Sequence, residues 1–412
     1  MSRNITVLGA GIVGVATACS LQRDGHQVTL VDRLPPGEYC SFGNAGLLCP
    51  SWCTPLVLPG TWRRVPQWLR DPLGPLTVRW GHLPKMLPWF AAAFGTLRGK
   101  RWLAIAGALR KLTSVTFDAY APLARDAGAS DLIRRDGYLI AYEREATWQK
   151  DALDWETRRA LGVRMETLDG AALRALEPEL GSHYVRGLHL PDEGHVANPL
   201  GLTQRLTGHF VARGGSLLQR DVLDLDVGAD GPRALITDGE RVPVETLVLC
   251  AGIHSSRFAA QLGSPVPLMT QRGYHSHIED PGIAVRRPTM SGEGKFFATP
   301  MEHGLRVAGT VEFAAMEAEP DYRRADAILA RARAMLPKLG GSKVTRWMGH
   351  RPCLPDSLPI IGPSPRFGNV YYAFGHGHLG LCTAAVTGRL VAEMVGGKPA
   401  GIDPAPYRVD RF

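Results

Sequence analysis

Near the end of the chain, residues 375–380 read GHGHLG and join an apolar strand-like run, 370–374, to a helix-like run, 383–395. Glycines leave the backbone bare, so another group can approach it closely. The free N–H groups and the dipole at the start of the following helix favour an anion. The stretch therefore predicts a loop that receives a ligand with developing negative charge, with Gly375 and Gly377 giving clearance.

The other end of the chain carries a second glycine-rich turn. Residues 5–14 read ITVLGAGIVG, in which a short apolar strand precedes Gly9, Gly11 and Gly14. The first glycine permits a tight turn, the second lets the backbone reach a pyrophosphate, and the third lets helix pack on strand. A second strand ends at Asp32, about 20 residues on, where an acid accepts a hydrogen bond from a ribose hydroxyl. The pattern predicts a dinucleotide site. The acid disfavours NADP, and both FAD and NAD remain.

The two turns together narrow the choice of cofactor. A nicotinamide dinucleotide needs only one such cradle, for its pyrophosphate. A flavin benefits from another, because its N1–C2=O edge becomes anionic on reduction and a helix N-terminus stabilises that charge. We therefore predict that FAD lies between the two ends of the chain.

Two further segments have the character of cofactor loops. Residues 41–46, SFGNAG, suit a loop along a phosphate or ribityl chain, although an ordinary polar turn has the same composition. Residues 246–252, TLVLCAG, read as a buried strand that leaves a nucleotide-binding sheet or simply enters a turn. The residues expected to contact FAD are Gly9, Gly11, Ile12, Val13, Gly14, Asp32, Arg33, Ser41, Asn44, Ala45, Gly46, Val222, Ala251, Gly252, Gly375, Gly377, His378, Leu379 and Gly380.

The order of these motifs resembles that of the D-amino-acid oxidase superfamily. The features that carry the resemblance are GAGIVG with Asp32, SFGNAG, the strand that ends at Ala251-Gly252, the run GHRP at 349–352 with Pro355-Asp356, residues 359–362, and GHGHLGL. Within that superfamily the chain looks most similar to bacterial D-amino-acid dehydrogenase small subunits. This group includes enzymes that act on D-proline-type substrates, and the resemblance covers essentially the whole length.

The resemblance implies roles for particular residues. In that family the arginine of a G-x-R-P motif binds the substrate carboxylate, and here it is Arg351, whose guanidinium fork suits a carboxylate. The position of His378 supplies a backbone carbonyl for the substrate amine. Oxidases of the family often add a tyrosine three residues before a sheet proline, but Phe297 stands there and cannot donate. We expect Tyr274 or His275 to take over as the second carboxylate ligand, and the alternative is that they are sheet-core side chains.

The resemblance also implies an activity. It predicts oxidation of the Cα–N bond of D-amino acids, including cyclic D-imino acids such as D-proline or hydroxy-D-proline, by hydride transfer from Cα to flavin N5. Electrons would pass to a respiratory acceptor such as a quinone. No protein base is obligatory when the substrate amine is neutral. Two alternatives stay open: an amine oxidase of the glycine or sarcosine type that uses O₂, and the flavin subunit of a hetero-oligomeric dehydrogenase.

The motifs are interleaved along the chain. We predict a mixed α/β fold in which a Rossmann-like FAD-binding domain comprises residues 1–50, 190–265 and 349–412. A substrate domain built on an antiparallel sheet would comprise residues 51–189 and 266–348.

Composition places the chain among ordinary globular proteins. Of its 412 residues 45% are hydrophobic and 21% charged, and we find no uncharged apolar run long enough for a spanning helix. The N-terminus enters a strand at once and lacks the pattern of a signal peptide. Seven scattered cysteines have no metal-ligand spacing, so we expect reduced thiols, no metal and a cytoplasmic location.

The net charge of +8 is concentrated in residues 54–102. This basic Trp-rich segment carries eight Lys or Arg residues, one acid, Asp71, and five tryptophans. Indole rings and cations suit the headgroup region of an anionic membrane, which predicts a peripheral position at the cytoplasmic face of the inner membrane. A solvated basic face of a helical subdomain is the alternative. Nucleic acid is a weaker alternative, because no recognition motif accompanies the charge, and we expect none to bind.

Overall fold

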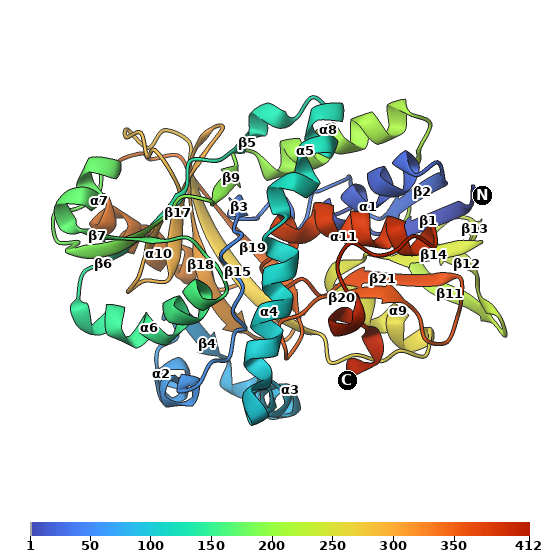
Figure 1. Cartoon of the computed structure of the whole chain (residues 1–412), viewed down its shortest axis with the longest axis horizontal. Coiled ribbons are helices and arrows are strands. Elements are labelled where there is room, and N and C mark those ends of the chain that lie inside the picture. The colour runs from blue at the N-terminus through green and yellow to red at the C-terminus, as the bar shows by residue number, and fades with distance from the viewer. Residues whose placement is uncertain (1) are drawn as a thin grey trace.

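The structure is a computed structural model that describes residues 2–412, apart from the side chains of Arg64, Gln67, Trp68 and Leu69. Arg64 and Trp68 of the basic Trp-rich segment therefore lie outside the described side chains. Two large sheets dominate the molecule and lie side by side, with both chain termini on the side of the first sheet (Figure 1). The predicted mixed α/β fold is confirmed.

The first sheet has six strands, five of them parallel. Their order is β10 (Ser216–Gln219), β2 (Gln27–Asp32), β1 (Asn4–Leu8), β14 (Thr246–Leu249), β21 (Val370–Phe374) and the antiparallel edge strand β20 (Ile360–Pro363). Side chains alternate between the two faces, so Ile5 and Val7 enter one core and Leu8 enters another. The strands near both ends of the chain thus lie in one sheet, separated only by β14.

Helices α1 (Ile12–Arg23), α8 (Pro199–Ala212) and α11 (Gly380–Val395) cover one face of this sheet (Figure 1). Helices α1 and α11 touch at backbone distance, because a Cβ built on Gly388 would lie 2.6 Å from the carbonyl oxygen of Ala16. The other face packs against α9 (Ser255–Gln261) and a small sheet of β11 (Val222–Gly228), β12 (Gly231–Thr237) and β13 (Arg241–Pro243). Because β1 and β21 run in the same direction, α1 and α11 both begin at one edge of the sheet.

The second large sheet has nine strands and is mainly antiparallel. Its order is β19 (Val344–Cys353), β15 (Met269–Ile278), β18 (Gly304–Phe313), β17 (Phe296–Met301), β16 (Thr289–Ser291), β6 (Tyr138–Tyr142), β8 (Arg186–Leu190) and β7 (Glu166–Asp169), with β4 (Leu76–Val78) paired to β18. Helix α10 (Arg323–Met335) packs on one face. A third, short sheet contains β3 (Leu47–Leu48), β9 (Gly194–Val196) and β5 (Ile133–Arg134). The domain boundaries given above remain a prediction.

The remaining helices divide between the two large sheets. They are α2 (Val65–Arg70), α3 (Leu83–Gly95), α4 (Arg101–Thr113), α5 (Thr116–Asp126), α6 (Glu145–Ala160) and α7 (Gly170–Leu176), together with the 3-10 turns η1 (Thr61–Arg64), η2 (Trp80–His82), η3 (Arg98–Lys100), η4 (Ser130–Leu132), η5 (Gly252–His254), η6 (Ala405–Tyr407) and η7 (Val409–Arg411). The basic Trp-rich segment forms α2, β4, α3 and the first residues of α4, at the lower edge of Figure 1. Among the described residues, no helix has both the length and the apolar character needed to cross a bilayer.

Candidate active site

A cavity of about 1280 Å³ is lined by residues of both large sheets. Drug-sized ligands occupy pockets of roughly 300–1,000 Å³, so this volume suits a dinucleotide with a small second ligand. The lining includes the turn after β1, the end of β2, the turn before α11 and residues of β15, β18 and β19. The cavity therefore brings both glycine-rich turns of the sequence to one place.

The turn after β1 shows which glycines the protein itself requires. A Cβ on Gly9, where φ is +113°, would lie 2.4 Å from the carbonyl oxygen of Cys250, and a Cβ on Gly14 would lie 1.8 Å from that of Gly9. A Cβ on Gly11 would meet only the Ser41 hydroxyl oxygen, at 3.5 Å. The protein thus has room for a side chain at position 11, and the bare backbone there is left for a ligand.

The start of α1 has the donors that a pyrophosphate needs. The amide of Ile12 donates to the Ser41 hydroxyl at 2.9 Å, whereas the amides of Val13 and Gly14 have no protein acceptor among residues 2–412. Asp32, at the end of β2, accepts from the Ala10 amide at 2.6 Å and from the Leu34 amide at 3.0 Å. Each carboxylate oxygen retains a lone pair that can accept from a ribose hydroxyl.

The turn before α11 is built on two glycines with left-handed backbones. Gly375 has a φ of +81° and Gly377 one of +55°, and the Gly377 amide donates to the Pro352 carbonyl at 2.9 Å. The His376 ring is buried and shares a hydrogen bond with the Thr387 hydroxyl at 3.0 Å. His378 instead opens onto the cavity, and the protein around its ring, with a contribution from Arg351, lowers its pKa to about 4. Burial also lowers the pKa of the His376 ring, to about 3, so both imidazoles are neutral at pH 7.

Arg351 is a cation without an acidic partner. Its guanidinium packs over Gly273, where a Cβ would lie 2.1 Å from Nη2, and its Nη1 donates to the Thr310 carbonyl at 2.9 Å. No carboxylate of the described side chains lies within 4 Å of it, and desolvation lowers its pKa from the usual value. Thr310 has a φ of +57°, which is unusual for a β-branched residue and is found mainly at functional sites. The arrangement leaves a half-buried charge and free donors ready for an anionic ligand.

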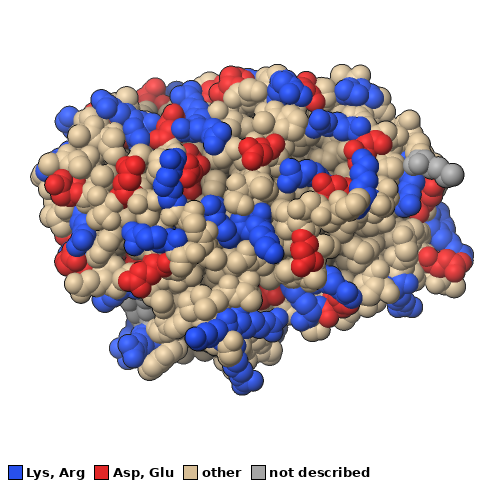
Figure 2. All heavy atoms as spheres, viewed as in Figure 1, with Lys and Arg blue, Asp and Glu red and all other residues tan. Residues whose placement is uncertain are grey.

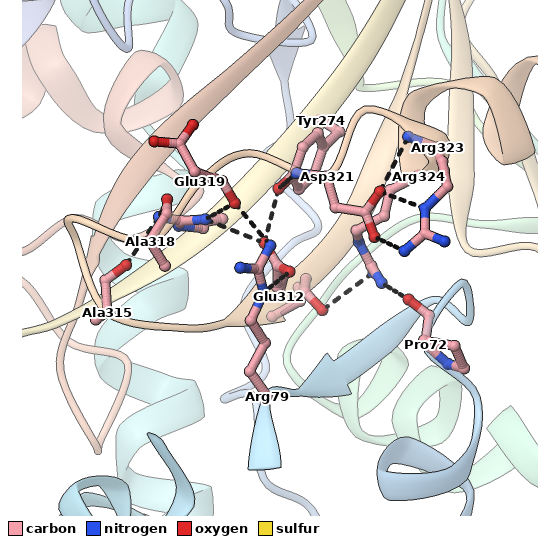
Figure 3. Close-up of polar contacts among 12 residues, drawn as sticks. Pro72, Arg79, Tyr274, Glu312, Ala315, Ala318, Glu319, Asp321, Arg323 and Arg324 are labelled. Carbon is pink, nitrogen blue, oxygen red and sulfur yellow. Dashed lines mark hydrogen bonds and ion pairs between the residues drawn. The ribbon is translucent and has the colours of Figure 1, made fainter. Parts of the chain in front are cut away.

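Tyr274 and His275, the two residues expected to help Arg351, both have other partners. The single O–H of Tyr274 donates to Glu312 at 2.7 Å, and its oxygen accepts from the Asp321 amide at 3.1 Å (Figure 3). The His275 ring contacts the Gly43 carbonyl oxygen through Nδ1 at 3.1 Å and stacks on Trp347. The role of either residue as a carboxylate ligand stays a prediction, and their contacts do not favour it.

The other predicted site residues fall mostly on the cavity wall. The lining contains Gly9, Gly11, Ile12, Val13, Asp32, Arg33, Ser41, Asn44, Ala45, Val222, Ala251, Gly252, Gly375, Gly377, His378 and Gly380. Gly14, Gly46, Leu379 and His275 lie outside it. Their contact with a cofactor or substrate remains a prediction.

Sequence reasoning missed an aromatic part of the wall. Trp52 and Met290 line the cavity beside Phe297, and the rings of Trp52 and Phe297 lie 5.7 Å apart. Arg158 lies over the Trp52 ring at 4.4 Å and is paired with Asp154. These residues belong to separate elements and share no motif, so only the tertiary structure brings them together.

The fold and the cavity fit a dinucleotide placed between two helix N-termini. A family described as FAD dependent oxidoreductase (DAO) matches residues 4–394. A D-amino-acid oxidase of Bradyrhizobium diazoefficiens is 38% identical over 419 aligned residues, which cover 100% of this chain and 99% of the relative. A D-amino acid dehydrogenase of the same organism is 31% identical and covers 99% of this chain and 98% of the relative.

Solved structures share the fold. Glycine oxidase from Geobacillus kaustophilus matches with a TM-score of 0.77 over 100% of both chains, at 19% identity. L-Proline dehydrogenase from P. horikoshii matches with a TM-score of 0.74 over 100% of this chain and 98% of its own, at 18% identity. The chain belongs to the DAO family of FAD-dependent oxidoreductases, which confirms the predicted family and the predicted cofactor.

Substitution of Gly11 separates folding from cofactor binding. In Gly11→Ala the apoprotein should melt within about 2 °C of the wild type, because the new Cβ meets no protein atom closer than an ordinary contact. Its affinity for FAD should fall at least about tenfold, or about 1.4 kcal/mol, because the methyl group occupies the approach of the pyrophosphate. Thermal melting and titration of apoprotein with FAD measure the two effects.

Gly14→Ala is the matched control, because its Cβ would collide with the backbone of Gly9. This variant should lose stability as well as FAD. Wild-type FAD affinity in Gly11→Ala would show that the pyrophosphate does not lie on this turn.

Proposed function

We propose that the protein oxidises the Cα–N bond of D-amino acids and that Arg351 binds the substrate carboxylate. The observation that carries the proposal is the half-buried guanidinium of Arg351, which has free donors, no acidic partner and a place on the cavity wall with the turn before α11. The D-amino-acid oxidase and dehydrogenase similar to this chain support the choice of substrate class.

We assign the remaining orientation of the substrate to backbone and apolar groups. The carbonyl of His378 would accept from the substrate amine, and its neutral ring would add no competing charge. Trp52, Met290 and Phe297 form an apolar wall that favours hydrophobic or cyclic side chains, including the D-proline class. Bound FAD supplies the acceptor for the hydride that leaves Cα. The protein's own contribution is to orient the substrate by its carboxylate and amine and to exclude water.

We propose further that electrons pass to a quinone and that the basic Trp-rich segment docks on an anionic membrane at the cytoplasmic face. Three of its apolar side chains are largely exposed, with Trp62 60%, Trp80 63% and Leu87 56% accessible. The lower edge of the molecule, where α2 and α3 lie, carries Lys and Arg with few acids beside them (Figure 2). Exposed indoles and cations together suit a headgroup surface.

An anaerobic panel of amino acids tests the substrate class. The FAD absorbance of the purified protein should bleach with D-amino acids, D-proline and hydroxy-D-proline among them, and should persist with the L-enantiomers. Bleaching by L-amino acids or by glycine and sarcosine alone would contradict the proposal. Re-oxidation of the reduced flavin by air, with formation of peroxide, would show that O₂ and not a quinone is the acceptor.

Arg351→Met tests the carboxylate site. A hydrogen bond to a charged group contributes about 1.5–3 kcal/mol, so KM for a D-amino acid should rise roughly 10- to 100-fold while the FAD content stays at the wild-type level. Arg346→Met is the matched control, because Arg346 lies on the same strand, is exposed and pairs with Asp326. An unchanged KM in Arg351→Met would place the carboxylate elsewhere.

A double variant, Trp62→Ala with Trp80→Ala, tests the membrane surface. It should co-float with anionic phospholipid vesicles several-fold less than the wild type, because both exposed indoles are removed. The control is Val211→Ala, which removes an exposed apolar side chain from α8, at the upper edge of Figure 1 and away from the basic Trp-rich segment. Equal flotation of wild type and double variant would contradict docking through this segment.

A further inference from the structure

Arg306 is a second cation without an acidic partner, and it is more deeply buried than Arg351. It lies on β18 with a side chain that is 7% exposed, and its Nη1 donates to two backbone carbonyls, of Phe42 at 2.8 Å and of Asn44 at 2.6 Å. Its Nε is buried and has no acceptor among the described residues. Both carbonyls belong to the SFGNAG loop, in which Gly43, Asn44 and Ala45 line the cavity.

The carbonyl between these two is held by His275. A carbonyl oxygen can only accept, so the His275 Nδ1 must carry the proton in its 3.1 Å contact with Gly43. The same ring stacks on Trp347 at 5.3 Å, and a Cβ on Gly43 would lie 2.1 Å from the Trp347 ring. Three consecutive carbonyls of the loop are thus held from the second sheet, and the loop has little freedom to shift.

The charge of Arg306 is not needed for these hydrogen bonds. Neutral donors also bind carbonyls, whereas a desolvated cation without a counter-charge costs several kcal/mol. Burial lowers the pKa of Arg306 to about 10, and no acid offsets it. Other buried arginines differ. Arg158 pairs with Asp154, and Arg272 lies 3.6 Å from Glu312. Arg306 does not itself line the cavity, so an anion that offsets its charge would act from the other side of the SFGNAG loop.

We propose that Arg306 is a positioning residue for FAD: it fixes the SFGNAG loop against the cofactor, and its unmatched charge favours the reduced, anionic flavin. His275 assists by holding the central carbonyl, a role distinct from that of a substrate ligand. The proposal needs FAD as the cofactor but does not depend on which amine is oxidised. A nearby cation stabilises an added negative charge in a site of low dielectric, so it raises the reduction potential of the bound flavin.

The test compares Arg306→Gln with Arg306→Lys in the holoprotein. Reductive titration against a reference dye gives the midpoint potential, and titration of apoprotein with FAD gives the dissociation constant. Arg306→Gln should shift the potential to a more negative value and raise the dissociation constant about tenfold. Arg306→Lys should keep a potential close to wild type at pH 7, because it retains the charge, and should bind FAD more weakly because it lacks the fork.

Arg324→Gln is the matched control. Arg324 is also fully buried and donates to the carbonyls of Pro72 and Gly74, but Glu312 and Asp321 lie near it (Figure 3). This variant should lower the melting temperature and leave the potential unchanged. Folded Arg306→Gln with wild-type potential would overturn the proposal. So would equal shifts in Arg306→Gln and Arg306→Lys, because charge would then not be the cause.

If Arg306→Gln does not fold, Arg306→Lys alone can test whether the charge at position 306 affects the flavin potential. A buried lysine loses its proton at a lower pH than an arginine, so the potential of this variant should fall below that of the wild type as the pH is raised. A constant difference between the two potentials across pH 6–10 would contradict a role for the charge.

Discussion

The parallel order of β1, β14 and β21 is the constraint on which the site depends. It places the starts of α1 and α11 at one edge of a sheet, although the two helices lie at opposite ends of the chain. The packing that maintains this strand order includes two contacts at which a glycine lies directly against another backbone segment. Gly9 lies against the backbone after β14, and Gly388 of α11 lies against the backbone of α1. Because backbone meets backbone at both contacts, the distance between the two helix N-termini is fixed, and a ligand that spans them meets a preformed site.

Charge is the second feature that organises the cavity. Arg351 and Arg306 are both desolvated and neither has a carboxylate within 4 Å among the described side chains. Burial lowers the pKa of His378 and of His275, and the neighbouring Arg351 and Arg306 respectively add to the shift, so both rings stay neutral. Arg351 lines the cavity and Arg306 lies behind the SFGNAG loop, and neither charge is offset by a carboxylate in contact with it. We infer that the substrate carboxylate and the reduced flavin are the anions that balance them.

Much of the cofactor cradle could be predicted from local sequence, because the glycines that must lie against another backbone recur at a characteristic spacing. The part of the cavity wall that the second large sheet forms could not be predicted in this way. Tyr274 and His275 are adjacent on β15 and therefore face opposite sides of the sheet, and the sequence does not say which side is the cavity. The register of β15 with β19, in which Gly273 pairs with Gly349, determines which side of β15 faces the cavity. Arg306 was missed for a related reason: it sits in an alternating strand, has no motif, and acquires its partners only when the SFGNAG loop folds onto β18.

A crystal structure of the protein with FAD tests the central claim most directly. We expect the pyrophosphate on the turn of Gly9 to Gly14, with the N1–C2=O edge of the ring within hydrogen-bond distance of the amides at the start of α11. A structure in which the ring lies away from the GHGHLG turn, and that turn faces solvent, would contradict the claim that both helix N-termini hold one flavin.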